Sequence, residues 1–143
     1  MKILIINGPN LNLLDKRDKT VYGNFGLNQI EELIRKEYPK DHFEFYQSNI
    51  EGEIVNMIQS AQSGFEGLVI NPGGYAHTSV AIHDSLELCK IPKIEVHLSH
   101  LANREDFRQN LITAKKTNGY ISGFNEKSYL AAIYLLKLIH AES

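Results

Sequence analysis

The chain alternates short apolar segments with amphipathic ones, and this alternation constrains its fold more than any other feature. The short segments have the length and composition of strands, and the amphipathic ones have the 3.6-residue spacing of helices. Neighbouring parallel strands must be joined by a crossover connection, usually a helix, so this order predicts a parallel sheet. The expected strands are residues 2–7, 42–48, 67–71, 93–97 and 119–123, and the expected helices are residues 27–38, 51–64, 78–89 and 128–141.

This order predicts a single α/β domain over residues 1–143, with a flavodoxin-like, doubly wound sheet of five parallel strands. Right-handed crossovers place helices on both faces of such a sheet. Thr78 or Ser79 can cap the third helix at its N-terminus, and Gly64 can end the second helix. The last helix is apolar on almost all sides, which predicts either deep burial or a contact with another subunit.

Composition argues against several classes of protein. The formal charge of −2 gives no strong attraction to nucleic acid or to an anionic membrane surface. The apolar run at residues 3–6 is too short for a signal peptide or a membrane span. Cys89 is the only cysteine, so no internal disulfide can form, and we expect a reducing, cytoplasmic location.

Polar side chains gather after the first, third and fourth expected strands. The segments there read NGPNLN, NPGGYAHTS and HLSH, and they begin at Asn7, Asn71 and His97. In open parallel sheets, ligands bind beyond the carboxyl ends of the strands. We therefore expect these three segments to line one pocket.

The same segments argue against several kinds of ligand. No glycine-rich phosphate-binding motif occurs, which disfavours a flavin or a nucleotide. The first and third strands end in Asn7 and Asn71, so the acidic residues of a response regulator are missing. His97 and His100 have H-x-x-H spacing, but a strand end does not direct both rings at one ion. No H-E-x-x-H motif is present either, so no metal site is expected.

Acid–base chemistry fits these residues better. Glu95 and His97 are two apart on one expected strand, so their side chains share a face. A carboxylate beside an imidazole can fix its tautomer and keep it protonated, which makes His97 a candidate general acid. The alternative is that both are merely polar positions at the end of a strand.

A second pair lies in the long polar stretch at about residues 11–25, which we expect to act as a lid. The pKa of a free tyrosine is about 10, so Tyr22 needs help to act as a base. Arg17 lies five residues earlier, and a nearby guanidinium favours the tyrosinate form. The alternative is a solvated charge cluster beside a tyrosine that only packs.

Six motifs occur in order through nearly the whole chain: INGPNLNLL, the Arg17/Tyr22–Gly23 pair, QSNIEGEI, INPGGYAHTSVAIHD, IEVHLSH and REDFR. Together they resemble those of the type II 3-dehydroquinate dehydratases. The resemblance implies a flavodoxin-like fold, no cofactor, no metal, and a homododecamer of four trimers. It implies a lyase that dehydrates 3-dehydroquinate to 3-dehydroshikimate by non-covalent anti elimination through an enolate. The pathway would be the shikimate route to chorismate and aromatic amino acids, or alternatively quinate breakdown.

The resemblance also implies roles for individual residues. The catalytic roles are proton acceptor for Tyr22, proton donor for His97, orienting partner for Glu95, transition-state stabiliser for Arg17 and water holder for Asn10. The substrate contacts fall on Asn71, His77, the backbone N–H of Leu98, Ser99, Arg108, and Asp84 from a neighbouring subunit, with Arg104 as a second arginine near the lid.

Some alternatives stay open. The chain departs from the family pattern at Asp15 and Lys19 in the expected lid, and at Ile50 and His83 elsewhere. It can be another enzyme on this scaffold that acts on a different cyclic hydroxy acid, or a binding protein with a relict pocket. A lysine imine mechanism is disfavoured, because no lysine lies in the strand-end segments and Lys93 opens its strand at the opposite end.

Overall fold

The fold is a five-stranded parallel sheet covered by helices, as the sequence predicts. The computed structural model describes residues 1–22 and 26–143, with only the backbone of Tyr22 described. The strands lie in the order β2-β1-β3-β4-β5 and are all parallel. They are β1 (Lys2–Asn7), β2 (His42–Gln47), β3 (Gly67–Asn71), β4 (Lys93–His97) and β5 (Gly119–Ser122).

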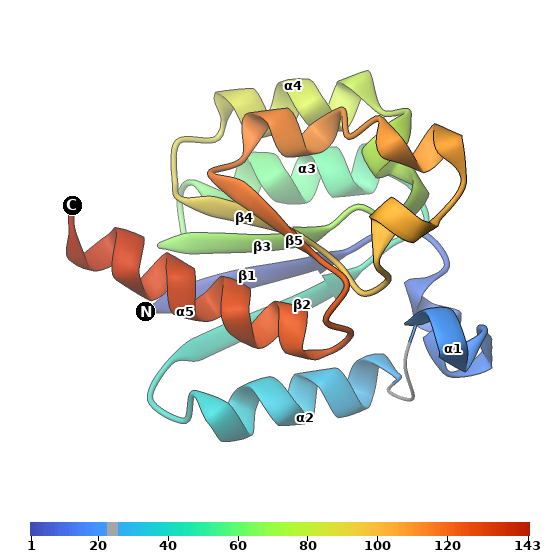
Figure 1. Cartoon of the computed structure of the whole chain (residues 1–143). Coiled ribbons are helices and arrows are strands. Elements are labelled where there is room, and N and C mark those ends of the chain that lie inside the picture. Colours follow the sequence, from blue (N-terminus) through green and yellow to red (C-terminus); the bar gives the residue numbers. More distant parts are fainter. Residues whose placement is uncertain (23–25) are drawn as a thin grey trace.

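Helices cover both faces of the sheet, which confirms the doubly wound arrangement. The helices α3 (Glu51–Ala61) and α4 (Val80–Leu88) lie on one face, and α2 (Leu27–Glu37) and α5 (Lys127–Ala141) lie on the other (Figure 1). Along β1, Ile3 and Ile5 belong to the core beneath α2 and α5, whereas Leu4 and Ile6 belong to the core beneath α3 and α4. A strand covered on both sides must be apolar at successive positions, which explains its continuous apolar run.

The predicted helix ends are partly confirmed. Ser79 is the N-cap of α4, because its hydroxyl accepts a hydrogen bond of 2.9 Å from the Ile82 N–H. The expected C-cap at Gly64 is wrong, since α3 ends at Ala61 and Gly64 does not have a positive φ. The chain leaves α3 through a turn in which the Gly64 and Phe65 N–H groups bond to the Ala61 carbonyl, so no left-handed residue is needed.

The last helix is covered on one side only. Tyr129 and Ile133 are buried against the sheet, while Tyr134 is 57% exposed and Leu138 is 45% exposed. Of the two predicted explanations for its apolar composition, deep burial within a single chain is therefore wrong.

Two stretches without regular periodicity contain short helical turns. The expected lid holds a 3-10 turn, η1 (Leu11–Lys16), and a short helix, α1 (Lys19–Tyr22). Leu11 and Leu14 of η1 are buried in the core, so the first half of this stretch is not simply polar loop. The segment after β4 holds η3 (Leu101–Asn103) and η4 (Asp106–Gln109). None of the helices in the described part of the chain has the length and apolarity that crossing a bilayer requires.

Candidate active site

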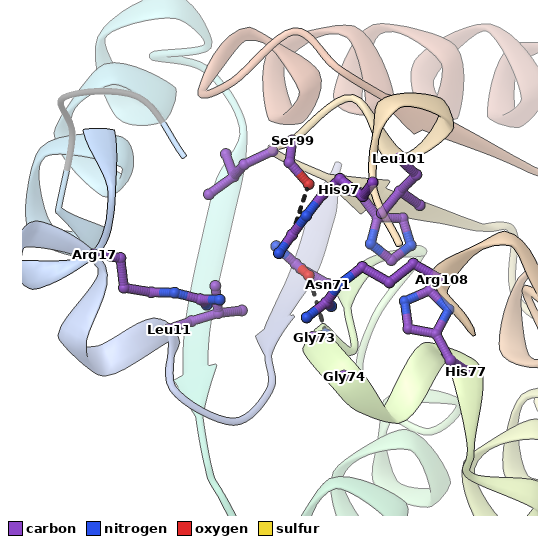
Figure 2. Close-up of a pocket in the computed structure, with 12 residues that line it drawn as sticks. Leu11, Arg17, Asn71, Gly73, Gly74, His77, His97, Ser99, Leu101 and Arg108 are labelled. Carbon is purple, nitrogen blue, oxygen red and sulfur yellow. Dashed lines mark hydrogen bonds between the residues drawn. The ribbon is translucent and has the colours of Figure 1, made fainter. Parts of the chain in front are cut away.

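A pocket lies beyond the carboxyl ends of β1, β3 and β4, which confirms the location predicted from the strand-end segments. Side chains from opposite sides converge on it, with Arg17 on one side and His77, His97 and Arg108 on the other (Figure 2). The predicted site residues that line it are Arg17, Asn71, His77, His97, Leu98, Ser99, Arg104 and Arg108.

Glu95 and His97 form a buried pair at the end of β4. Glu95 is completely buried and His97 is 5% exposed. His97 Nε2 donates to Glu95 Oε2 at 2.7 Å, as the shared strand face predicts. This bond uses Nε2, so Nδ1 is the ring nitrogen that remains for a ligand, and His97 lines the pocket.

Thr113 is a partner of this pair that the sequence does not predict. It lies in the 3-10 turn η5 (Thr113–Lys116), is completely buried, and donates a short hydrogen bond from Oγ1 to Glu95 Oε1. Both carboxylate oxygens of Glu95 therefore have a donor, as a buried carboxylate requires. No local pattern reveals this contact, because the two residues are 18 positions apart in the sequence.

His77 lies beside His97 in the pocket. Their rings stack with centroids 6.1 Å apart, at an interplanar angle of 26°. Partial burial lowers the pKa of His77, and the charges of His97 and Arg108 lower it further, against the opposing effect of the Asn110 carbonyl. His77 is therefore neutral near pH 7. Its Nδ1–H donates to the Asn110 carbonyl at 3.0 Å, which leaves Nε2 as an acceptor.

The pocket is electropositive. Arg17, Arg104 and Arg108 all line it, and no aspartate or glutamate is among its described lining residues. Two of these guanidinium groups are positioned by neighbours: Arg104 Nη1 donates to Ser99 Oγ at 3.2 Å, and Arg108 Nε donates to Glu105 at 3.1 Å. Such a surface favours an anionic ligand.

Local structure explains how Arg17 reaches the pocket. Its N–H donates to the Leu14 carbonyl at 3.2 Å and closes η1. Leu11 and Leu14 anchor that turn in the core. The guanidinium is therefore carried by a segment that packs against the sheet.

Four predicted site residues are not among those that line this pocket. Glu95 is one of them, although its partner His97 lines the pocket. Asn10 has a left-handed φ of 69° and lies in an adjoining groove with Leu13, Lys16 and Arg17. Asp84 lies on α4 with 62% of its side chain exposed and does not line the pocket of its own chain. The side chain of Tyr22 lies outside the described residues, so the predicted pair with Arg17 stays a prediction.

One cluster in the described part of the chain has the composition of a metal site. His83, Asp84 and Glu87 place ligand atoms within 4.8 Å of one another on α4, outside the pocket. These groups are already engaged, His83 with Asp84 at 2.8 Å and Glu87 with Lys116 at 2.8 Å. The H-x-x-H pair is divided, because His97 lines the pocket and His100 lines a neighbouring groove.

The fold and the pocket together define a flavodoxin-like α/β enzyme in which a buried carboxylate–histidine pair adjoins an arginine-lined pocket. Residues 1–137 match the profile of the family described as Dehydroquinase class II. The chain belongs to this family.

Individual relatives agree with the family match. A 3-dehydroquinate dehydratase from Fusobacterium nucleatum is 49% identical over an alignment of 144 positions, which covers 96% of this chain and 97% of that protein. One from Thermotoga neapolitana is 43% identical over an alignment of 145 positions, which covers 100% of this chain and 99% of that protein. The crystal structure of a type II dehydroquinase from Butyrivibrio crossotus has a TM-score of 0.93 at 45% identity, over 96% of this chain and 97% of that one.

Proposed function

We propose that the protein is a lyase that dehydrates 3-dehydroquinate to 3-dehydroshikimate in the shikimate pathway, and that it does so without a covalent intermediate. One observation carries the proposal: the buried Glu95–His97 pair presents His97 to a pocket lined by three arginines. An anionic ring substrate fits that charge, and a dehydration needs an acid for the departing hydroxyl. The family match and the named relatives support the choice of substrate.

In the proposed reaction, a base removes the proton from the carbon next to the ketone, and the electrons of that bond move onto the ketone oxygen to form an enolate. The enolate then re-forms the ketone and expels the hydroxyl group, which leaves as water after taking a proton. His97 gives that proton, and Glu95 stabilises the imidazolium through the Nε2 hydrogen bond of 2.7 Å.

Tyr22 is the proposed base, and Arg17 keeps it ionised. A guanidinium close to a phenol favours the phenolate and lowers the pKa of the phenol toward neutrality. Arg17 lines the pocket, so it can also stabilise the negative charge that develops on the enolate. Asn10 holds a water against the enolate oxygen, and residues 11–25 act as a lid that excludes bulk solvent.

The remaining lining residues bind the substrate. Its carboxylate accepts hydrogen bonds from Asn71, Ser99 and the backbone N–H of Leu98, all of which line the pocket. Its ring hydroxyls contact His77, whose Nε2 is an acceptor, and Arg108. No lysine is among the described lining residues, which supports elimination without an imine.

The proposed assembly is a homododecamer of four trimers, in which Asp84 of one subunit reaches the pocket of its neighbour. The exposed carboxylate of Asp84 and the exposed apolar side chains of α5 are compatible with burial at subunit contacts. The single cysteine, Cys89, favours a reducing compartment, and we place the enzyme in the cytoplasm.

The proposed activity is tested by mixing the purified protein with 3-dehydroquinate and following the ultraviolet absorbance of the conjugated product. The wild-type protein should give a steady rise. Tyr22→Phe and His97→Ala should each reduce kcat by about 10²–10⁴-fold, the usual contribution of one acid or base. Tyr134→Phe and His42→Ala are matched controls at exposed positions and should retain activity.

Two outcomes would contradict the proposal in different ways. Wild-type protein that produces no absorbance would instead favour a different cyclic hydroxy acid as substrate. Loss of activity after borohydride is added together with substrate would indicate an imine, and would replace the non-covalent mechanism with a lysine-dependent one.

A further inference from the structure

Two buried asparagines end neighbouring strands of the sheet. Asn7 ends β1 and Asn71 ends β3, and the two are paired in register. Paired residues of parallel strands direct their side chains to the same face. Here that face is the one covered by α5, and both asparagines are almost completely buried, at 4% and 3% exposure.

Tyr129 of α5 connects the two asparagines. Its hydroxyl donates to Asn7 Oδ1 at 2.5 Å and accepts from Asn71 Nδ2 at 3.2 Å. The tyrosine is completely buried, and this burial raises its pKa far above the usual value, so the hydroxyl keeps its hydrogen.

The number of hydrogens available fixes the orientation of the Asn71 amide. A phenol has one hydrogen, and Tyr129 gives it to Asn7, so only an N–H of Asn71 can face the phenol oxygen. On its other side, Asn71 Oδ1 accepts from the Gly73 N–H at 3.1 Å. Gly73 has a φ of +61°, a backbone conformation that glycine adopts without strain. Both bonds require the same orientation of the amide.

The orientation decides what Asn71 offers to a ligand. One N–H is bonded to Tyr129 and the carbonyl oxygen is bonded to Gly73, which leaves the second N–H of the amide. Asn71 lines the pocket, so this N–H is available to an acceptor there. If the amide turned over, the same position would present an oxygen, which repels a carboxylate.

We infer that Tyr129 is a positioning residue that locks the Asn71 amide with an N–H toward the pocket and so makes the site selective for a carboxylate over a neutral group. Tyr129 is not among the residues that line the pocket and acts only through Asn71. The inference rests on the proposed function for the identity of the ring acid.

Tyr129→Phe tests the inference, because it removes the hydroxyl and keeps the ring that packs in the core. Calorimetry measures the affinities for quinate, a cyclic hydroxy acid with a carboxylate, and for its neutral carboxamide. We expect wild-type protein to prefer the carboxylate, and Tyr129→Phe to reduce that preference about ten-fold, as expected when one donor to a charged group is lost. With 3-dehydroquinate, KM should rise about ten-fold while kcat changes by less than about three-fold.

Tyr38→Phe is a matched control. The Tyr38 hydroxyl donates to the Leu130 carbonyl at 2.7 Å, and Leu130 follows Tyr129 on α5. Tyr38 does not line the pocket. This variant also loses one tyrosine hydrogen bond, and it should keep the wild-type carboxylate preference. An equal loss of preference in both variants would show a general loss of stability and would overturn the inference.

A double-mutant cycle tests whether Tyr129 acts through Asn71. In an Asn71→Ala background, Tyr129→Phe should change the carboxylate preference by less than about two-fold. The full ten-fold loss in that background would overturn the inference. Asn7→Leu gives a second approach if Tyr129→Phe folds poorly. It frees the phenol hydrogen, so Tyr129 no longer requires an N–H of Asn71 to face it and only the Gly73 N–H still holds the amide; it should lower the preference as well.

These measurements separate the inference from the proposed function. Wild-type protein that prefers the carboxylate but does not turn over 3-dehydroquinate would count against the dehydratase activity alone. An active wild-type enzyme whose preference survives both Tyr129→Phe and Asn7→Leu would overturn the role of Tyr129 alone. A wild-type protein with no preference for the carboxylate would overturn the inference whatever the enzyme assay shows.

Discussion

Glu95 Oε2 accepts a hydrogen bond of 2.7 Å from His97 Nε2, and both residues are buried at the end of the same strand. A buried carboxylate in this position holds the ring in one orientation. The pair therefore links the geometry of β4 to the chemistry of the proposed reaction.

Replacing the charge of Glu95 should slow the reaction. Glu95→Gln keeps the shape of the side chain but removes the negative charge that stabilises the imidazolium, so we expect kcat to fall by about 10²-fold with little change in KM. Steady-state kinetics measure this, with Glu44→Gln, an exposed carboxylate on β2, as the control. A kcat within a factor of about two of wild type would remove Glu95 from the catalytic machinery.

The hydrogen bond from Thr113 to Glu95 should contribute to the rate of the reaction. Thr113→Val is similar in size but cannot donate to Glu95 Oε1, so one oxygen of a buried carboxylate loses its partner. We expect kcat to fall about ten-fold, which corresponds to about 1.4 kcal/mol. Thr113→Ser restores the hydroxyl and should recover most of the rate. If serine and valine variants behave alike, packing rather than the hydrogen bond is responsible.

The neutral state of His77 predicts an acid-sensitive contribution to stability. Burial lowers the pKa of His77 in the folded state below its ordinary value of 6.5. As pH falls below about 6.5, the unfolded chain binds a proton that the folded chain does not, so the free energy of unfolding decreases. His77→Gln should therefore flatten this loss of stability, as measured by urea unfolding at several pH values between 7.5 and 5. His42→Gln, at an exposed position, should keep the wild-type slope.

A second pH dependence of the free energy of unfolding is expected from Asp41, at the opposite end of the sheet. Burial raises the pKa of Asp41, but hydrogen bonds and charges from Lys137 and the N-terminal amine outweigh this and lower it overall. The stability from this pair is present above the unfolded pKa near 4 and is lost as pH falls through the folded pKa. Asp41→Asn should lower the free energy of unfolding at pH 7 by about 2 kcal/mol. The difference from wild type should shrink below pH 4, and kcat should stay unchanged.

Gly8 lies where the fold leaves no room for a larger side chain. A methyl group there would overlap the Pro72 carbonyl oxygen, and the Gly8 N–H donates to the Asn71 carbonyl at 2.8 Å. Gly8→Ala should therefore destabilise the protein by about 1–3 kcal/mol, the cost of overpacking, and weaken substrate binding. Gly52→Ala in α3, where nothing lies within 4 Å of the added carbon, should instead stabilise it by about 0.5–1 kcal/mol. Thermal unfolding distinguishes the two.

Local patterns along the chain were enough to predict the strands, the face shared by Glu95 and His97, and the end of the sheet where the pocket lies. These features depend on periodicities of two and 3.6 residues and on the order of elements, which are local properties of the chain. The predicted end of α3 at Gly64 was wrong, because the helix ends at Ala61 in a turn that needs no glycine with a positive φ.

The distant residues that support the site become apparent only in the folded protein. Thr113 forms a hydrogen bond with Glu95, 18 positions away in the sequence. Tyr129 forms hydrogen bonds with Asn71, 58 positions away, and with Asn7, 122 positions away. No periodic pattern records such contacts, because they depend on how α5 and η5 pack against the strand ends after the chain has folded. The chemistry of the site is therefore readable along the chain, whereas the hydrogen bonds that hold its groups in place exist only in three dimensions.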